Sequence, residues 1–460
     1  MSGLVPVSVL SRPSPDAAPI GQATVHLTTF GCQMNEYDSE LVRSILSAAG
    51  YGFTEQAGAA EVVLLNTCAI RENAHRTVFT ALDRLQARKR RGERLVVGLL
   101  GCMATNLRER LLAERPEIDL IAGPDSYRRL PQLLREAYEQ RRRGQDLGLS
   151  ESETYEQIYP RRAGGVNAWI AVMRGCDNFC SFCVVPYTRG RERSRAPEGV
   201  VEEARRAAAQ GYKQISLLGQ NVNSYRSGST DFASLLLQVA ALEGIERLRF
   251  TSPHPKDFPR ALLEALAGHS KLCKQVHLPL QAGSDAVLQR MKRSYTSAEY
   301  LGLVEQTRAW IPGVKLSTDL IVGFPGETDA DFERTLELVE QVEFDSAFTF
   351  LYSERVGTFA ARHFVDDVPR ELKGARLQRL IAVQRAISKR LNLAEVGRVE
   401  RVLVEGPSRR SSADWIGRTD GNKVVVFRQR GERPGELLDY RIVGANAATL
   451  RGERVYPGGG

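Results

Sequence analysis

Three cysteines lie close together near the middle of the 460-residue chain, at Cys176, Cys180 and Cys183. Three thiolates on one loop can bind three irons of a cubane iron–sulfur cluster, whereas ordinary electron-transfer clusters use four cysteines. The absent fourth ligand leaves one iron open, as catalytic zinc sites keep one position for water or substrate. The alternatives are a zinc knuckle completed by a distant histidine and three buried thiols, but structural zinc loops use paired cysteines rather than triplets. The spacing therefore favours an iron–sulfur cluster that binds a ligand.

A second set of cysteines, Cys32, Cys68 and Cys102, is spread over the first part of the chain at separations of 36 and 34 residues. Each follows an apolar run ("TTFGC", "LLNTC" and "GLLGC"), and each separation is about one strand–helix unit. Because parallel sheets bind ligands outside the carboxyl ends of their strands, the three thiols can converge on one point. The alternative is three incidental buried thiols, since free cysteine is common in cores. We predict a second three-cysteine cluster and assign no role to the isolated Cys273.

Four arginines follow the central cysteines at every second position, namely Arg189, Arg191, Arg193 and Arg195. In an extended segment such residues share one face, which would form a row of guanidiniums suited to phosphates. The alternative is a solvated loop paired with Glu192 and neighbouring acids. The net charge of 63 − 55 = +8 gives weak support for a nucleic-acid partner, because many basic proteins bind nothing anionic. We predict that these arginines contact RNA.

The elements that must position the first cysteines are strands and helices in alternation, from residue 24 to about 142. The strand candidates are "VHLTTF", "EVVLLN", "LVVGLLG" and "IDLIAG", and the clearest helices are Glu36–Ala49 and Glu72–Arg90. This pattern predicts a parallel α/β sheet covered on both faces. Residues 1–22 are expected to be a disordered leader, because no basic region precedes an apolar core as in a signal peptide. The polar, aperiodic residues 143–167 are expected to be a linker.

A longer alternation covers residues 168–395 and carries the central cysteines after its first strand. Six strand–helix units in about 190 residues fit a partial barrel better than a complete eightfold one. Residues 396–460 change to strands joined by glycine-rich turns, which predicts a small all-β barrel. The expected strands of the partial barrel are 169–173, 214–219, 247–252, 275–280, 315–323 and 347–352, and the expected helices are 199–210, 232–242, 259–267, 297–309, 329–341 and 370–393.

Polar side chains follow the later strands of the predicted barrel, where barrels of this kind place their chemistry. Each is about equally suited to bind a small molecule and to cap a turn. Candidates for a cofactor subsite are Gln220, Asn221, Ser252 with His254, Gln281, and Thr318 with Asp319.

The central cysteine segment resembles the radical S-adenosylmethionine superfamily, whose hallmark is C-x₃-C-x-Φ-C with an aromatic residue at Φ. Phe182 has this position and, by resemblance, would pack near the adenine of S-adenosylmethionine. The resemblance implies that the open iron binds this cofactor and that the cluster cleaves it to a 5′-deoxyadenosyl radical. Many members have Gly-Gly-Glu after the second strand, where this chain has Gly219-Gln220-Asn221, so the resemblance does not assign the contact to the cofactor's amino group.

Together the two cysteine sets resemble the radical S-adenosylmethionine methylthiotransferases, over about residues 24–456. The resemblance implies a flavodoxin-like N-terminal domain (23–142) with an auxiliary cluster on Cys32, Cys68 and Cys102. It also implies a partial (β/α)₆ TIM-type radical domain (168–395) and a C-terminal TRAM β-barrel (396–460). The segments that carry it are "FGCQMNEYDSE", "NTCAIRENA", "FCVVPYTRGRERSR", "LLGQNVNSY", "FTSPHPKDF" and "HLPLQAGSD".

Within this family, "QNVNSY" is similar to the branch that acts on N6-(dimethylallyl)adenosine at position 37 of tRNA. The resemblance implies methylthio transfer to C2 of that base, with two 4Fe-4S clusters and two S-adenosylmethionine molecules per turnover. The implied partners are the tRNA anticodon stem-loop, an electron donor and a sulfur donor. We expect a cytoplasmic monomer with no membrane contact, because no apolar run approaches the roughly 18 residues that span a bilayer.

Three alternatives remain at this point. The same chemistry could act on threonylcarbamoyladenosine of tRNA or on a side chain of a ribosomal protein. The chain could also be a non-catalytic RNA-binding protein with structural metal sites.

Overall fold

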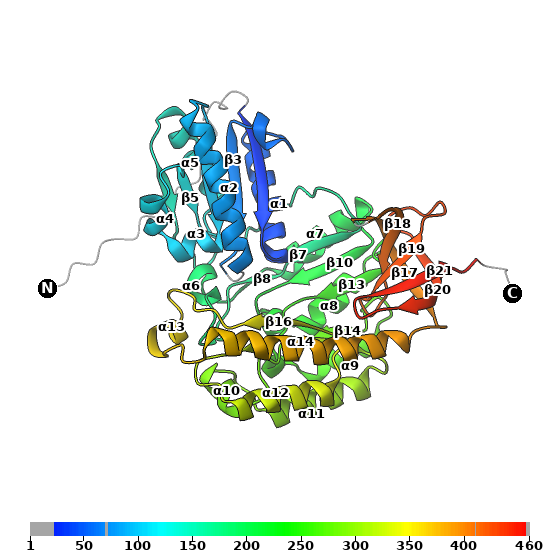
Figure 1. Ribbon diagram of the computed structural model, residues 1–460. Helices are drawn as coiled ribbons and strands as arrows, with labels where there is room; N and C mark the ends of the chain where they lie inside the picture. Colours follow the sequence, from blue (N-terminus) through cyan, green and yellow to red (C-terminus); the bar gives the residue numbers. More distant parts are fainter. Residues whose placement is uncertain (1–22, 70–71, 410, 457–460) are drawn as a thin grey trace.

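The computed structural model describes residues 23–69, 72–409 and 411–456. The expected leader, residues 1–22, lies outside the described residues. An N-terminal α/β unit, a central partial barrel and a small C-terminal barrel follow one another along the chain (Figure 1). None of the helices in the described ranges is long and apolar enough to cross a membrane.

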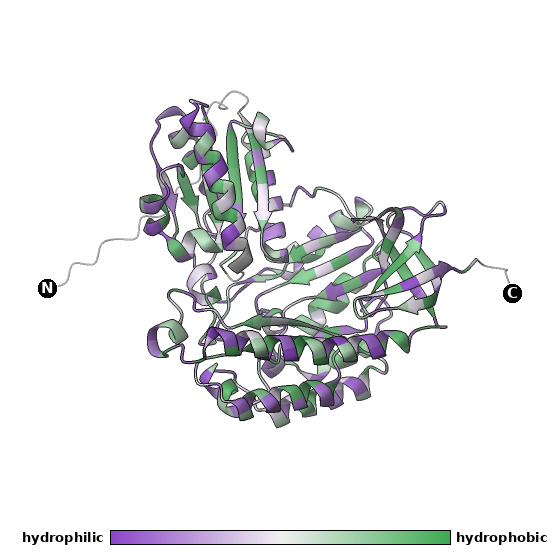
Figure 2. Cartoon of the chain, viewed as in Figure 1, coloured by the Kyte–Doolittle hydropathy of each residue, from purple (hydrophilic) through white to green (hydrophobic). Residues whose placement is uncertain are grey.

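The N-terminal unit is a six-stranded, wholly parallel sheet in the order β2-β1-β3-β4-β5-β6. The order of its first five strands is that of flavodoxin, which confirms the expected fold. Strands β3 and β4 are buried on both faces, as central strands under helices must be, and β3 is coloured hydrophobic in Figure 2. The elements are β1 (Thr24–Phe30), α1 (Gln33–Ala48), β2 (Gly52–Phe53), β3 (Val62–Thr67), α2 (Glu72–Arg90), β4 (Val96–Gly101), α3 (Cys102–Leu107), α4 (Glu109–Glu114), β5 (Leu120–Ala122), α5 (Leu130–Glu139) and β6 (Gly144–Asp146).

The segment 143–167, expected to be a linker, is instead partly built into the N-terminal unit. It begins with β6, which pairs with β5 as the edge strand of the sheet. Tyr155 is fully buried, its hydroxyl donates to the carbonyl oxygen of Pro124 at 2.8 Å, and the same hydroxyl accepts from the backbone N–H of Tyr127 at 3.0 Å. A three-residue strand and a single buried ring leave no periodic pattern in a polar segment, so the prediction of a linker was wrong here.

The central unit has six parallel strands in chain order, in two three-stranded sheets, β7-β10-β13 and β14-β15-β16. A parallel bridge between Leu248 and Leu272 joins the two sheets. Within the described residues β7 and β16 do not pair, so the barrel is open, as predicted. The strands are β7 (Asn167–Ala171), β10 (Gln214–Leu218), β13 (Arg247–Phe250), β14 (Gln275–His277), β15 (Lys315–Val322) and β16 (Ser346–Leu351), and the helices are α7 (Pro197–Ala209), α8 (Phe232–Ala240), α9 (Arg260–Gly268), α11 (Ser297–Trp310), α12 (Asp329–Val342) and α14 (Arg370–Leu393).

Short strands and helices lie in the loops at the carboxyl ends of these strands, where the candidate site residues are also found. They are the ribbon β8 (Met173–Arg174) with β9 (Arg193–Ser194), the hairpin β11 (Arg226–Ser227) with β12 (Thr230–Asp231), and the helices α6 (Val185–Arg189), α10 (Asp285–Arg290) and α13 (Phe359–His363).

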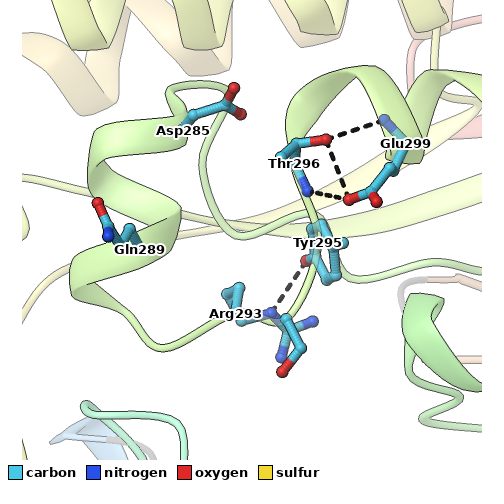
Figure 3. Close-up of a pocket in the computed structure, with 7 residues that line it drawn as sticks. Asp285, Gln289, Arg293, Tyr295, Thr296 and Glu299 are labelled. Atoms are coloured by element: carbon cyan, nitrogen blue, oxygen red, sulfur yellow. Dashed lines mark hydrogen bonds between the residues drawn. The ribbon is translucent and has the colours of Figure 1, made fainter.

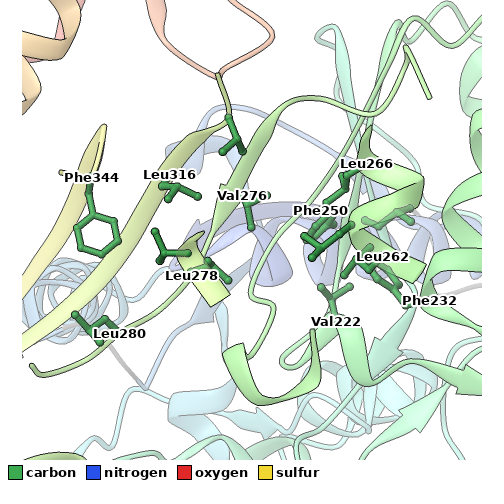
Figure 4. Close-up of a cluster of buried hydrophobic side chains, with 14 of the residues drawn as sticks. Val222, Phe232, Phe250, Leu262, Leu266, Val276, Leu278, Leu280, Leu316 and Phe344 are labelled. Carbon is green, nitrogen blue, oxygen red and sulfur yellow. The ribbon is translucent and has the colours of Figure 1, made fainter. Parts of the chain in front are cut away.

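Aliphatic and aromatic side chains between strands and helices form the core of the partial barrel. Figure 4 shows Val276 of β14, Leu278 just after it and Leu316 of β15 in one cluster with Phe344, all buried. Burying each such side chain contributes about 1.5–3 kcal/mol, so the strands that bear the candidate site are held rigidly.

The C-terminal unit is a closed five-stranded barrel in the order β17-β18-β19-β21-β20, which confirms the predicted all-β module. It docks where the strands of the partial barrel begin, because Arg247 at the start of β13 donates to the carbonyl oxygens of Arg401 and Arg418, each at 2.6 Å. Arg249 donates to the carbonyl oxygen of Thr419 at 2.8 Å. The strands are β17 (Val399–Ser408), β18 (Ser411–Arg418), β19 (Val424–Arg428), β20 (Leu437–Ala445) and β21 (Thr449–Arg454).

Candidate functional site

The three central cysteines lie on the loop that follows β8, at the carboxyl end of the first barrel strand. The backbone N–H of Cys176 donates to the carbonyl oxygen of Gly190 at 3.1 Å, so the loop folds back on the chain that leaves it. This approach needs a glycine beforehand, since a Cβ at Gly175 would lie 2.0 Å from the carbonyl oxygen of Arg191 and its φ is +79°. Cys176 and Cys180 are buried. The local backbone thus gathers three thiols at the expected end of the barrel.

Burial dominates the electrostatics of the Cys176 and Cys183 thiols. It raises the pKa of Cys176 to about 11 and also raises the pKa of Cys183. Arg293 lies beside these thiols: its charge partly opposes the raised pKa of Cys183, and its Nη1 donates to the Cys180 Sγ at 3.4 Å. Sequence reasoning missed Arg293, since it is distant in sequence and has no motif of its own. Iron binding would keep all three groups as thiolates, because a coordinating thiol is deprotonated outright.

A pocket of about 380 Å³ lies beside Arg293, between α10 and α11. Figure 3 shows the Arg293 Nε donating to the Tyr295 hydroxyl, at 2.9 Å, at the edge of this pocket. Thr296 and Glu299, also in its wall, form the capping box of α11. Thr296 bonds with Glu299 and Arg293 with Tyr295, and Arg293 also reaches the cysteine loop.

Cys32, Cys68 and Cys102 each follow a neighbouring strand of the N-terminal sheet, namely β1, β3 and β4. The first two flank the switch point of the strand order, where sheets of this type bind ligands. They approach closely: a Cβ on Gly31 would lie 2.8 Å from the Cβ of Cys68. A hydrogen bond from the Cys68 thiol is the main reason that the pKa of Cys32 is lowered to about 6, and nearby Arg189 lowers it further. The sheet therefore converges these thiols, as predicted from their spacing.

Neither cysteine set, as the structure describes it, has the geometry of a site for a single metal ion. Within the described ranges, no three His, Cys, Asp or Glu side chains have the geometry to hold one metal ion. In a cubane each thiolate binds a different iron, which requires a wider separation than a mononuclear site. All seven cysteines are free thiols, so six remain available as ligands, and Cys273 is buried apart from both sets.

The four arginines do not form a solvent-facing row, so that prediction was wrong. Residues 185–189 form the helix α6 rather than an extended segment, and Arg189, Arg193 and Arg195 are buried. Arg193 pairs with Asp125 at 3.0 Å, and Arg195 pairs with Glu203 at 2.7 Å. The physical reason is that this segment is enclosed between the N-terminal sheet and the barrel, where acidic side chains compensate its charge. Arg191 alone of the four is exposed (69% of its side chain), and it pairs with Asp177 at 2.8 Å.

Asp38 of α1 is central to this buried seam between the two units. Its two oxygens accept from Arg174 at 2.8 Å and from Arg189 at 2.7 Å. Burial alone would lower the pKa of Arg174, but the Asp38 carboxylate outweighs it and keeps that pKa raised. Sequence reasoning missed both residues, although each lies within a few positions of a candidate cysteine, Asp38 after Cys32 and Arg174 before Cys176.

Gln220 and Asn221 directly follow β10 and carry unmet hydrogen-bonding capacity. The Gln220 Oε1 and the Asn221 Oδ1 are buried and have no hydrogen-bond partner in the described part of the chain. The Asn221 Nδ2 donates to Glu192 Oε1 at 3.2 Å, and the same oxygen accepts from the backbone N–H of Asp177, next to Cys176. Two buried acceptors, one of them on a residue linked to the cysteine loop, fit a bound group with N–H or O–H donors.

Ser252 and Gln281 lie in the segments that follow β13 and β14 and have left-handed backbones, at φ of +59° and +72°. Such conformations are costly for residues other than glycine and cluster at binding sites, which supports the predicted subsite. Asp319 lies on β15 and accepts from His277 Nε2 at 3.2 Å. Phe182 packs edge-on to Phe324, with ring centroids 6.5 Å apart.

Two other polar candidates are structural. Thr318 is fully buried on the opposite face of β15 from Asp319, and its hydroxyl donates to the carbonyl oxygen of Leu278 at 2.7 Å. His254 Nδ1 accepts from the backbone N–H of Lys256 at 3.2 Å, and burial lowers the pKa of its ring to about 2. His254 is thus a neutral capping group. Neighbours in a strand face opposite ways, which explains why only one of the pair Thr318-Asp319 faces the candidate site.

Three known families match successive parts of the chain. Residues 24–123 match the family described as "Uncharacterized protein family UPF0004", residues 170–339 match the radical SAM superfamily, and residues 393–455 match the TRAM domain. Among solved structures, the radical S-adenosylmethionine methyltransferase TsrM from Kitasatospora setae aligns with a TM-score of 0.55 at 16% identity, covering 74% of this chain and 77% of that one. That likeness concerns the fold alone.

Curated relatives match nearly the whole chain. A tRNA-2-methylthio-N(6)-dimethylallyladenosine synthase from Prosthecochloris aestuarii is 49% identical over 95% of this chain and 99% of its own length. One of the same name from Porphyromonas gingivalis is 46% identical over 94% of this chain and 95% of its own length.

Proposed function

Because the chain belongs to the family of tRNA-2-methylthio-N(6)-dimethylallyladenosine synthases, we propose that its two cysteine sites together transfer a methylthio group to C2 of N6-(dimethylallyl)adenosine at position 37 of tRNA. Membership of this family makes the chain a radical S-adenosylmethionine enzyme and excludes a non-catalytic RNA-binding protein. The proposal that the two sites act together is supported by their proximity. Arg189, six positions after Cys183, donates to the Cys102 thiol.

The cofactors would be two 4Fe-4S clusters and S-adenosylmethionine. When bound, the cluster on Cys176, Cys180 and Cys183 would supply the electron that cleaves S-adenosylmethionine, and the cluster on Cys32, Cys68 and Cys102 would carry the sulfur that is transferred. The protein contributes binding and exclusion of water.

Around the first cluster, Phe182 provides an aromatic wall packed on Phe324, and Gln220 and Asn221 offer buried acceptors. Ser252, Gln281 and Asp319 complete the subsite at the neighbouring strand ends.

The inner face of β16 favours an apolar group on the substrate base. Phe348 and Phe350 are 56% and 41% exposed and share a face, while Ala347, just before them on the opposite face, packs against the core. In register with them on β15 are Asp319 and Ile321. A dimethylallyl group would gain apolar contact there, whereas the carboxylate of threonylcarbamoyladenosine would meet Asp319. This face supports the dimethylallyl substrate over that alternative.

We expect reconstituted enzyme to methylthiolate an anticodon stem-loop RNA bearing dimethylallyladenosine, and to prefer it over the same RNA with plain or threonylcarbamoylated adenosine. Phe348→Gln combined with Phe350→Gln should lower the preference over plain adenosine about tenfold, because each lost methylene contact is worth about 0.8 kcal/mol. Mass spectrometry of the digested RNA gives kcat/KM for each substrate.

A matched control is Leu237→Gln, an exposed apolar residue on the outer helix α8, which should keep the preference. An unchanged preference in the double phenylalanine variant would show that the dimethylallyl group binds elsewhere. A preference of the unaltered enzyme for threonylcarbamoylated RNA would contradict the proposed substrate itself.

Affinity for the RNA backbone is assigned to Arg191 and to the C-terminal barrel, whose residues 396–460 carry 12 basic against 8 acidic side chains, a net +4. Arg430→Gln with Arg433→Gln, both exposed on this barrel, should flatten the salt dependence of tRNA binding by about two units of logarithmic slope, because each lost phosphate contact contributes about 0.9. Titrations at several salt concentrations measure the slope.

The control pair is Arg205→Gln with Arg206→Gln on α7, which pair with Glu202 on the outer surface. If both pairs of substitutions leave the slope as it was, the C-terminal barrel binds some partner other than the RNA backbone.

We further propose that the protein works as a cytoplasmic monomer with a separate electron donor and sulfur donor. The tRNA substrate suits that compartment, and each cysteine set is complete within a single chain.

A further inference from the structure

Arg189 joins the radical domain to the second cysteine set. It is the last residue of α6 in the partial barrel and is 2% exposed. Its Nε donates to the Cys102 Sγ at 3.1 Å, and its Nη2 donates to Asp38 Oδ2 at 2.7 Å. Asp38 fixes the plane of the guanidinium, because Arg174 holds its other oxygen at 2.8 Å. The guanidinium is therefore presented to Cys102 in one orientation.

One nitrogen of this guanidinium remains to be satisfied. The Arg189 Nη1 is buried and has no hydrogen-bond partner among the residues that the structure describes. A buried charged donor without a hydrogen-bond acceptor costs about 1–3 kcal/mol or more. We therefore expect an acceptor to bind next to the Arg189 Nη1. The thiols of Cys102 and Cys32 are both near enough to interact electrostatically with Arg189. The acceptor that this position favours is a sulfur atom bound among these thiols.

We propose that Arg189 is a positioning residue of the auxiliary cluster, which donates to the Cys102 thiolate through Nε and to a cluster sulfur through Nη1. This inference rests on the proposed function, because it needs a cluster on Cys32, Cys68 and Cys102. Hydrogen bonds and positive charge at cluster sulfurs stabilise the reduced form, which carries more negative charge. Arg189 therefore raises the reduction potential of this cluster.

The contact between Arg189 and Cys102 also lies at the interface between the N-terminal unit and the partial barrel. Cys102 begins α3 of the N-terminal unit, whereas Arg189 ends α6 of the barrel, and these helices pack together around Ala69, Cys102 and Val184. Since α6 begins two residues after Cys183, any shift of the radical-cluster loop moves the guanidinium as well. The environment of the auxiliary cluster thus depends on the radical domain.

The test uses the full chain with Cys176, Cys180 and Cys183 all changed to Ala, so that only the auxiliary cluster is assembled. Its midpoint potential is measured by redox titration followed by electron paramagnetic resonance, with iron content in parallel. Arg189→Met should make reduction at least tenfold less favourable, a shift of about 59 mV for one electron. Arg189→Lys keeps the charge but loses the two-nitrogen geometry, so its potential should fall by less.

The matched control is Arg195→Met, since Arg195 is buried in the same seam and bonds to Tyr37 of α1, at 3.1 Å, rather than to a cysteine. The inference is overturned if Arg189→Met keeps the parent potential, or if Arg195→Met lowers it equally. Should Arg189→Met fail to fold, Arg189→Lys decides, and an unchanged potential there also overturns it. A parent chain that assembles no four-iron cluster would instead refute the proposed auxiliary cluster.

Discussion

Changing Cys68 to Ala should abolish methylthio transfer to tRNA while S-adenosylmethionine is still cleaved to 5′-deoxyadenosine. Cys68 lies at the switch point of the N-terminal sheet beside Cys32, and a cubane with only three protein ligands will not tolerate the loss of another. The central cysteines lie on a different unit and keep their own three thiols. Without the auxiliary cluster no iron remains to carry the sulfur, so we expect no methylthiolated base above background.

Cys180→Ala should show the converse pattern, with no 5′-deoxyadenosine and an intact auxiliary cluster. Quantifying 5′-deoxyadenosine, modified nucleoside and iron in anaerobic reactions distinguishes the two variants, and iron should fall from about eight to about four per chain in each. Cys273→Ala is the matched control, because this thiol is buried apart from both sets and should affect neither product. Methylthiolated tRNA made at a comparable rate by Cys68→Ala would refute the division of roles.

Replacing Asp38 by Asn should destabilise the protein more than any other single change of a carboxylate to its amide in the seam between the units. The substitution preserves shape but leaves the Arg174 and Arg189 guanidiniums without their shared carboxylate in a buried place. Breaking a buried ion pair by removing one partner costs about 3–5 kcal/mol. The expected fall in the thermal midpoint is roughly 3–5 °C, measured by calorimetry on anaerobically prepared protein.

The matched control is Glu202→Gln, which removes a carboxylate paired with Arg205 and Arg206 on the outer surface of α7. Exposed pairs of this kind contribute about 0–1 kcal/mol, so its midpoint should barely move. Equal midpoints for the two variants would mean that the seam does not depend on the Asp38 charge.

Sequence patterns predicted the fold well where the determining interactions are local. Apolar runs such as "EVVLLN" fix the buried strands, and the helix over Glu72–Arg90 was predicted with its observed bounds. The convergence of Cys32 and Cys68 was predictable as well, because each follows a strand of one parallel sheet and strand ends share an edge.

The sequence-based predictions that were wrong depend on interactions between segments far apart in the chain. The alternating arginines were predicted to form an exposed row that binds phosphates. A local pattern cannot show that these arginines are buried against Asp38, Asp125 and Glu203 from other parts of the chain. Tyr155 was unpredictable for a related reason, because a lone ring in a polar segment becomes a core residue only through Tyr127 and Pro124.

The docking of the C-terminal barrel has an evolutionary consequence. Arg247 and Arg249 donate to the carbonyl oxygens of Arg401, Arg418 and Thr419. The attachment of the barrel therefore depends on its main chain rather than on its side chains. Substitutions at those three positions leave the acceptors in place, and the outward surface of the barrel can diversify without loosening its attachment. If this barrel binds RNA as proposed, selection can change its RNA contacts while its attachment to the catalytic domains stays the same.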